Sequence, residues 1–294
     1  MANMELIKKL RDLTQAGVMD AKKALEANND DIDLAIQWLR EKGIAKAAKK
    51  ANAIATEGVA NVVIDGNLAV IYEFNCETDF SAANQNFLDL ANDVGLTLVN
   101  GGYNDIEKAL TLLTSDDKTI DEACKELTSK IGEKISLRRF ELVSKKDNEM
   151  FAYYQHSNKK IAVLLVLDKI IDEAVGKDIA MHAAAMAPKF LNADQVDQEW
   201  LANETKILRE QTIAEGKPVE RADMIVKGRV NKLLSEVTLE AQPFVKDTSK
   251  TVKQHLATYG AASIVYVRYQ VGEGIEKKVV DFAAEVAEQM KKQN

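Results

Sequence analysis

The sequence predicts an α+β protein assembled from several modules. Only three prolines and 14 glycines interrupt its 294 residues, so long helices are permitted wherever apolar residues recur at helical spacing. Two pairs of β-rich runs, each joined by a polar turn, predict antiparallel hairpins in the middle of the chain. We therefore expect an N-terminal three-helix bundle, a two-part α+β core, an inserted antiparallel coiled-coil hairpin and a C-terminal helical module.

The composition is that of a soluble globular protein, which we expect in the cytoplasm. Hydrophobic residues make up 46% and charged residues 29% of the chain. No run approaches the ~20 apolar residues needed to cross a membrane, and the start, MANMELIKKLRDL, lacks the apolar core of a signal peptide. The net charge of -7 argues against a protein that mainly coats nucleic acid. Cys76 and Cys124 form no CxxC pair, which excludes a thiolate zinc site and favours a packing role.

Residues 1–55 are expected to form the N-terminal domain, a bundle of three short helices. Apolar residues on one face predict the first helix, which residues 14–17 end, and a second helix spans Val18 to Ala27. Residues 28–31 supply N-cap oxygens for a third helix, which Gly43 can close as the first residue after its C-cap. This arrangement resembles the ubiquitin-associated fold. The Ala- and Lys-rich run that follows, up to position 56, predicts a helical linker.

Residues 56–142 are expected to form the first half of the core. Two β-rich runs between Gly58 and Phe74 flank Asp65-Gly66, the strongest short signal for a hairpin. A helix from about Asn84 to Leu98 and a strand from Lys134 to Val143 follow. The second half of the core, residues 143–190 and 239–272, repeats this order. Its expected elements are a hairpin of residues 150–156 and 160–167, a helix at 176–187 and a closing strand at 262–271.

Residues 191–238 are expected to be an insertion that projects from the core as a coiled-coil hairpin. Two helical stretches, Ala193 to Ala214 and Val219 to Val237, are joined by a Gly-Lys-Pro turn. Trp200, Ile207 and Ala214 repeat every seven residues and predict the inner face of the first helix. The second helix offers apolar positions at Met224, Ile225, Leu233, Leu234 and Val237. An amphipathic helix then ends the chain in residues 273–294, the C-terminal module.

No catalytic constellation is present in the sequence. The three histidines, His156, His182 and His255, lack the spacing of a metal site. The lone GxG at Gly272 and Gly274 has no phosphate-binding context, so we expect no direct nucleotide binding and no cofactor. These absences predict a protein that makes no bonds, although carboxylates without a pattern leave an enzyme open.

The connector between the first hairpin and its helix, NCETDFSAANQNF, places Phe80 beside Asp79. Two explanations are open from the pattern. Phe80 packs on the core while Asp79 caps a helix, or the two side chains contact another molecule.

Six segments, in chain order, carry a resemblance to a known family. They are LRDLTQAGVMDAKKAL, FNCETDFSAANQNF, IGEKISLRRF, YYQH, IAMHAAAMAP and VGEGIEKKVVDFAAEVAEQ. Together they span nearly the whole chain, which closely resembles the bacterial translation elongation factor Ts family. The resemblance implies a non-enzymatic guanine-nucleotide exchange factor that binds elongation factor Tu and promotes release of its GDP.

The resemblance also implies roles for particular residues. The loop Thr78-Asp79-Phe80-Ser81 is expected to enter the GTPase domain, where Asp79 and Phe80 displace elements that hold magnesium. Ser81 stands where the family commonly has valine, so local packing of the loop is expected to differ.

Further partner contacts are implied for two other parts of the chain. The first comprises Val18, Met19, Lys22 and Lys23, for which a bundle core with solvated lysines is the alternative. The second comprises Ile131 and His156, and the alternative for His156 is an ordinary hairpin-turn histidine. The segment from Gly272 onward is expected to complete the grip on the GTPase domain.

Other functions are weighed against exchange. A peptide-binding adaptor would rest on the N-terminal bundle alone, which is about one-sixth of the chain. A small-molecule enzyme would need carboxylate chemistry and should tolerate loss of Phe80. The helical pattern of the insertion leaves open whether the coiled coil supports a homodimer or contacts a further partner.

Overall fold

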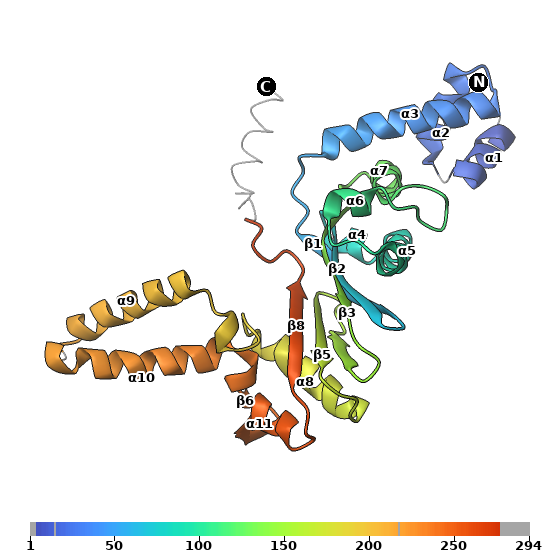
Figure 1. Cartoon of the computed structure of the whole chain (residues 1–294). Helices are drawn as coiled ribbons and strands as arrows, with labels where there is room; N and C mark the ends of the chain where they lie inside the picture. Colours follow the sequence, from blue (N-terminus) through green and yellow to red (C-terminus); the bar gives the residue numbers. More distant parts are fainter. Residues whose placement is uncertain (1–3, 15, 217, 277–294) are drawn as a thin grey trace.

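The computed structural model describes residues 4–14, 16–216 and 218–276. Helices and small antiparallel sheets alternate along the chain (Figure 1), which confirms the predicted α+β class. The predicted boundaries of the domains stay predictions. Most of the predicted C-terminal module, from position 277 onward, lies outside the described residues.

Three helices form the N-terminal part, as predicted: α1 (Met4–Thr14), α2 (Val18–Ala27) and α3 (Ile32–Lys50). Their apolar faces meet in a small cluster that buries Leu10, Ala24 and Leu25 completely. The side chain of Asp31 accepts a hydrogen bond from the backbone N–H of Leu34 at 2.9 Å and so caps α3.

The prediction that Gly43 ends the third helix is wrong. Helix α3 continues through Gly43 to Lys50 and takes in part of the predicted linker. A Cβ atom at Gly43 would lie 2.9 Å from the side-chain oxygen of Ser129 on α7 (Ile120–Ile131). The glycine therefore permits close packing of two helices, and it has no role as a cap.

The first sheet has the order β1-β2-β3, with β1 at Glu57–Asp65, β2 at Leu68–Cys76 and β3 at Ser136–Ser144. Asp65 pairs with Leu68, which confirms a tight hairpin turn at Gly66. Helix α5 (Gln85–Gly101) packs on the sheet closely enough that a Cβ at Gly95 would lie 2.6 Å from the Tyr72 ring.

Two helices between α5 and β3 have no counterpart in the predicted elements. They are α6 (Ile106–Leu110) and α7. The start of α7 carries a capping box in which Thr119 and Glu122 bond each other's backbone N–H groups. That Thr-x-x-Glu pattern before an apolar run is a readable helix start.

The second sheet has the order β4-β5-β8, with β4 at Met150–Gln155, β5 at Ile161–Leu167 and β8 at Ser263–Gln270. Helix α8 (Glu173–Met186) covers one of its faces. These elements lie at the predicted positions, and the closing strand returns after the insertion to pair with β5. The opposite face packs against the first sheet, where Ala60 and Ile71 are buried with Leu164 and Val166.

A short hairpin of β6 (Pro243–Phe244) and β7 (Asp247–Thr251), followed by α11 (Val252–Ala257), packs beside α8. It surrounds the fully buried His182, whose Nδ1 accepts a hydrogen bond from the backbone N–H of Val245 at 3.2 Å. The proton must then sit on Nε2, which lies 3.0 Å from the Gln242 side-chain oxygen. Burial lowers the pKa of His182, although the bond to Gln242 acts in the other direction.

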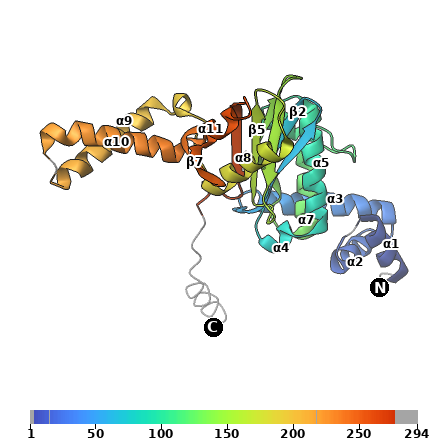
Figure 2. The same ribbon diagram turned by 90° about the horizontal axis from the view of Figure 1, so that it is seen from below.

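Helices α9 (Gln198–Ala214) and α10 (Val219–Val237) fold back on each other and project from the body as an arm (Figures 1 and 2). Two ion pairs cross between them, one from Arg209 to Asp223 at 3.0 Å and one from Arg229 to Glu215 at 2.5 Å. The predicted helical hairpin is therefore present.

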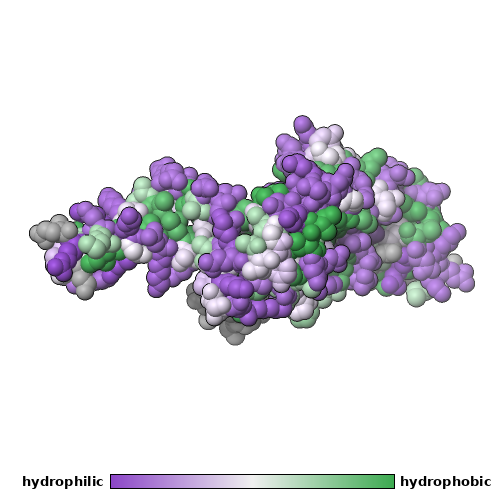
Figure 3. All heavy atoms as spheres, turned by 60° about the horizontal axis from the view of Figure 1, so that its bottom comes forward, coloured by the Kyte–Doolittle hydropathy of each residue, from purple (hydrophilic) through white to green (hydrophobic). Residues whose placement is uncertain are grey.

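The predicted inner face of the arm is wrong in part. Ile207 is 45% exposed and Met224 is 76% exposed, whereas Thr212 and Val226 lie in the contact between the helices. Ala214 is also exposed. The hydroxyl of Thr212 donates to the carbonyl of Leu208 at 2.6 Å, so a polar residue is hidden without loss of its hydrogen bond. The visible face of the arm carries hydrophobic as well as hydrophilic side chains (Figure 3).

Candidate protein-interaction site

Phe80 is the most exposed large hydrophobic side chain among the described residues, at 86% of its full accessible area. It lies on α4 (Asp79–Ala82), a single turn that directly follows the end of β2. Asp79 beside it is also exposed. The explanation in which Phe80 packs on its own core is therefore wrong.

The two flanking residues of the predicted loop face inward and build the turn. The Thr78 side chain accepts a hydrogen bond from the backbone N–H of Ser81 at 3.3 Å, so Thr78 is the N-cap of α4. Ser81 itself is buried. The four residues of the loop thus divide into an exposed pair, Asp79 and Phe80, and a pair that holds the backbone in place.

Glu133 clamps this turn from the loop after α7. Its two carboxylate oxygens accept hydrogen bonds from the Thr78 hydroxyl at 2.8 Å and from the Thr78 backbone N–H at 3.0 Å. Gly132, which adopts a left-handed φ of 87°, ends α7 and turns the chain towards Thr78. Sequence reasoning missed Glu133, because its partner lies 55 residues away in the chain.

Glu77 ties the same turn to two further elements. Its carboxylate accepts hydrogen bonds from the Lys50 side chain at 3.0 Å and from the backbone N–H of Lys134 at 2.7 Å. Lys50 is the last residue of α3, so the N-terminal helices and the residues after α7 both contact the base of the loop.

The base beneath the turn consists of a packed aromatic pair and an unreactive thiol. The rings of Phe74 and Phe87 pack at 5.1 Å between their centroids under the hairpin and α5. Burial, together with the nearby Glu133 carboxylate, raises the pKa of the Cys76 thiol to about 12. A thiol with that pKa is protonated at neutral pH, so Cys76 is no nucleophile.

Ile131 and His156 lie on elements next to this turn. Ile131 is the last residue of α7, two positions before Glu133, and is half-buried against the apolar core between the first sheet and its helices. His156 lies in the turn between β4 and β5, where its ring meets the Tyr154 ring edge-on at 6.2 Å. In the same turn the Lys160 side chain donates a hydrogen bond to the Glu57 carboxylate at 2.6 Å, and Glu57 pairs with Cys76, three residues before Asp79. The β4–β5 turn therefore lies near the exposed loop.

The N-terminal candidates form a separate surface. Val18 and Met19 at the start of α2 are exposed, so they are no part of the bundle core. Lys22 forms a surface ion pair with Glu26 at 3.7 Å, and Lys23 is exposed. Helices α1 and α2 lie away from α4 in both ribbon views (Figures 1 and 2).

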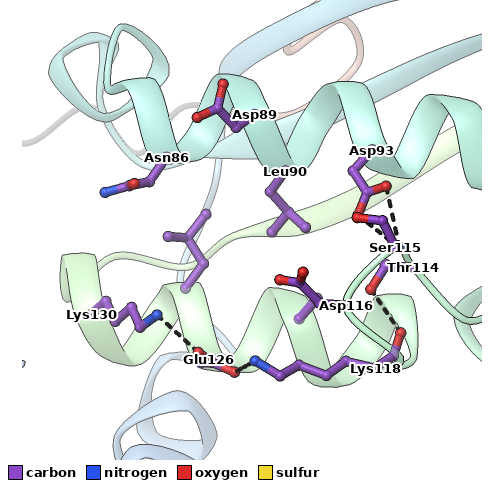
Figure 4. A pocket seen from close by; sticks show the side chains of 12 residues that line it. Asn86, Asp89, Leu90, Asp93, Thr114, Ser115, Asp116, Lys118, Glu126 and Lys130 are labelled. Atoms are coloured by element: carbon purple, nitrogen blue, oxygen red, sulfur yellow. Dashed lines mark hydrogen bonds and ion pairs between the residues drawn. The ribbon is translucent and has the colours of Figure 1, made fainter. Parts of the chain in front are cut away.

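A cavity of about 290 Å³ opens between α5 and α7, but Phe80 does not line it (Figure 4). Four carboxylates and two lysines line it, and both lysines pair with the same carboxylate. Glu126 pairs with both Lys118 and Lys130, and Asp93 accepts a hydrogen bond from the backbone N–H of Ser115 at 3.2 Å. Nothing in this wall points to a ligand.

Within residues 4–276, apart from the undescribed positions 15 and 217, no three His, Cys, Asp or Glu side chains gather as a metal site. No helix in that same part of the chain is long and apolar enough to span a membrane. The feature that stands out chemically is an aromatic side chain presented to solvent on a fixed turn.

Comparison with known proteins gives matches over nearly the whole chain. The family model described as elongation factor TS matches residues 77–273, which include the exposed turn. Elongation factor Ts of Lacticaseibacillus casei is 49% identical over 285 residues, covering 97% of this chain and 97% of that protein. The protein of the same name from Malacoplasma penetrans is 48% identical over 287 residues, covering 97% and 98%. That of Levilactobacillus brevis is 46% identical over 284 residues, covering 97% and 96%.

Proposed function

The chain belongs to the elongation factor Ts family, and on that premise we propose that it is the guanine-nucleotide exchange factor for elongation factor Tu in translation elongation. The observation that carries this proposal is the exposure of Phe80 on a turn that Glu133 and Glu77 hold in place. An apolar ring at 86% exposure gains free energy where another molecule covers it. We expect the chain to act in the cytoplasm.

Exchange requires a factor that binds the nucleotide-free GTPase more tightly than the GDP-bound form. A GTPase holds its nucleotide through a phosphate-binding loop, a lysine and a magnesium ion. By thermodynamic linkage, each ~1.4 kcal/mol of preference for the empty state weakens nucleotide binding about tenfold. The same preference makes the nucleotide weaken binding of the factor by an equal ratio.

Asp79 and Phe80 are the residues that we assign to this preference. Phe80 would enter the GTPase domain between its helices, and Asp79 would follow, so that elements holding magnesium are displaced. Covering one phenylalanine contributes about 1.5–3 kcal/mol, which corresponds to roughly tenfold to a hundredfold in affinity. Thr78 and Ser81 contribute by holding the turn, since their side chains face inward.

A single ring cannot supply the whole interface, so other surfaces must take part. We assign Ile131 and His156 to contacts beside Phe80, because their elements adjoin the turn. Val18, Met19, Lys22 and Lys23 would form a second contact on the N-terminal helices. A homodimer or a further partner bound through the arm stays a prediction.

The proposal is tested by loading elongation factor Tu with a fluorescent GDP analogue and adding excess unlabelled GDP. Catalytic amounts of the chain should accelerate loss of the fluorescent nucleotide, and the rate should saturate as the chain concentration rises. A release rate that does not change with added chain would refute the proposal. The chain's affinity for the empty GTPase should also exceed that for the GDP-loaded form, and equal affinities would refute it as well.

A further inference from the structure

The loop between α8 and α9 runs beside β8 (Figure 1), and a second cavity lies between them. Its volume is about 340 Å³, which is in the range of small-molecule sites. The apolar part of its wall consists of Ala187, Pro188, Phe190, Leu191 and Val267. The polar part consists of Lys189, Gln195, Tyr266, Arg268 and Glu273. We call this cavity the Arg268 pocket.

Arg268 brings a buried positive charge into the wall of the pocket. Its side chain is only 9% exposed. One of its terminal nitrogens donates to the Gln270 side-chain oxygen at 2.8 Å and lies 3.5 Å from the Ala184 carbonyl, and the other lies 3.7 Å from a Glu273 oxygen. Its Nε is enclosed and has no hydrogen-bond partner among the described residues. A buried donor without a partner is unfavourable, so an acceptor that reached this guanidinium would be bound favourably.

Positive charge exceeds negative charge around the pocket. Glu73 on β2 is fully buried and accepts hydrogen bonds from Arg138 and Arg139 at 2.7 to 3.0 Å. Glu273 lies 3.3 Å from Arg139 and 3.7 Å from Arg268. Within the part of the chain that the structure describes, three guanidinium groups thus share two carboxylates at ion-pair distance. One positive charge is left over, and a charge in a buried setting favours a counter-ion.

Two further hydrogen-bond donors line the pocket. Lys189 is exposed, forms no ion pair with a described carboxylate, and holds its Nζ 5.4 Å from the centre of the Trp200 ring. Gln195 is the last residue of η1 (Ala193–Gln195), and its side-chain oxygen accepts a hydrogen bond from the backbone N–H of Leu191 at 3.2 Å. That bond leaves the amide N–H groups of Gln195 for another acceptor.

Tyr266 adds no negative charge to the wall. Burial raises the pKa of Tyr266, so its hydroxyl stays neutral and donates to the Pro188 carbonyl at 2.8 Å. Glu273 is then the one anionic group among the described residues that line the pocket. The wall therefore combines apolar side chains, a surplus of positive charge and donors without acceptors.

We propose that the Arg268 pocket binds a small organic carboxylate, an acid with an apolar body. Its carboxylate accepts charge-assisted hydrogen bonds from Arg268 and Gln195, and Lys189 attracts it from the mouth of the pocket. Its apolar body packs on Phe190 and Leu191. A singly charged carboxylate suits one surplus positive charge, whereas a phosphate dianion would also be repelled by Glu273. This site goes beyond the proposed exchange function, and its test needs no elongation factor Tu.

The test titrates the full-length chain with the branched aliphatic acid isocaproate at constant ionic strength. The chain has two tryptophans, and Trp38→Phe leaves Trp200, whose ring lies 5.9 Å from that of Phe190, as the fluorescent reporter. Isocaproate should change this fluorescence with a dissociation constant of about 1 mM, as expected of so small a ligand. Isocaproamide has the same shape without the charge and should bind about tenfold more weakly. Inorganic phosphate should not displace the acid.

Variants measured by calorimetry separate the charges of the pocket. Arg268→Gln should raise the dissociation constant of isocaproate about tenfold or more, the effect of one lost charge-assisted hydrogen bond. Arg268→Lys keeps the charge without the guanidinium and should fall between. Lys189→Ala should weaken binding about threefold, because an exposed charge contributes less. Lys177→Ala is the matched control, since Lys177 is an exposed lysine on α8 that does not line the pocket, and it should change nothing.

Several results would overturn the proposal. Binding that does not saturate, by fluorescence and by calorimetry, would leave no site. Equal affinities for the acid and the amide would give the charge no role, and displacement by inorganic phosphate would show a general anion site. Unchanged affinity in a folded Arg268→Gln chain would remove the arginine from the site. If Arg268→Gln does not fold, the acid–amide comparison and that of Lys189→Ala with Lys177→Ala decide, because neither alters the buried arginine.

Discussion

Replacing Glu133 by alanine should slow nucleotide exchange while leaving the fold intact. The change removes both acceptors of Thr78, at 2.8 and 3.0 Å, and with them the clamp on the turn that carries Phe80. Hydrogen bonds to a charged group contribute about 1.5–3 kcal/mol each, so the pair contributes about 3 kcal/mol at the lower end. Thr78 is only half-buried, and water will replace part of that interaction. We therefore expect a loss of about tenfold in exchange, or ~1.4 kcal/mol.

The assay is release of fluorescent GDP from elongation factor Tu at a chain concentration below saturation. Glu133→Gln should fall between the unsubstituted chain and Glu133→Ala, because an amide oxygen still accepts one bond from Thr78. Glu210→Ala is the control, since Glu210 is an exposed glutamate on the arm. A Glu133→Ala chain that folds normally and exchanges at the unsubstituted rate would refute the clamp. So would an equal loss in a Phe80→Ala background, where no ring remains to be positioned.

Three further predictions concern stability and reactivity. The pKa of His182 lies below its ordinary value of about 6.5 in the folded chain, so the stability that this residue contributes is complete above about pH 6.5 and is lost as the pH falls through the folded pKa. In urea titrations at a series of pH values, His182→Gln should therefore lose less stability on acidification than the unsubstituted chain. An equal loss in both chains would contradict this prediction. Gly95→Ala should lower the free energy of unfolding by about 1–3 kcal/mol, because the new Cβ overlaps the Tyr72 ring. Gly228→Ala is the control: the Cβ position there is open, so the change should raise the free energy of unfolding by about 0.5–1 kcal/mol. Equal effects of the two changes in urea unfolding would argue against the overlap. The Cys76 thiol, whose pKa is about 12, should react with a thiol reagent at pH 8 only after unfolding, and rapid labelling of the native chain would contradict its burial.

Local patterns predicted the strands and helices of the core well. The Asp-Gly turn, the alternating runs and the helix that Asn84 caps depend on neighbours in sequence, which is why they can be read from the sequence. The same reading missed α7, although its Thr-x-x-Glu start was available. The prediction for Gly43 is wrong because a glycine after an apolar helical run can either end the helix or allow close packing against another helix. Only the position of Ser129 distinguishes these two roles.

The arm shows a different limit. A heptad spacing predicts Ile207 as an inner residue, and hydropathy predicts the same for Met224. Both are exposed, whereas Thr212 and Val226 are buried. A threonine that bonds the carbonyl four residues back packs much like a valine, so hydropathy alone assigns it to the wrong face.

The candidate site could be found only in part. Phe80 beside Asp79 was visible as an apolar residue in a polar connector, and the family resemblance gave it a role. The roles of Glu133 and of Glu73, which accepts a hydrogen bond from the backbone N–H of Gly272, were not visible, because their partners lie 55 and 199 residues away in the chain. Long-range pairs between ordinary glutamates, arginines and backbone groups leave no local pattern.

The most direct test of the central claim compares Phe80→Ala with the unsubstituted chain, with magnesium present and with magnesium chelated. Ile170→Ala is the control, because Ile170 is 66% exposed and lies just after β5, at the opposite end of that strand from the turn that holds His156. With magnesium present, Phe80→Ala should lower the rate of GDP release roughly tenfold to a hundredfold, and Ile170→Ala should not change it. After chelation the deficit of Phe80→Ala should largely disappear, because the ion whose release we assign to Phe80 is already gone. A Phe80→Ala chain that releases GDP as fast as the unsubstituted chain in magnesium would contradict the account.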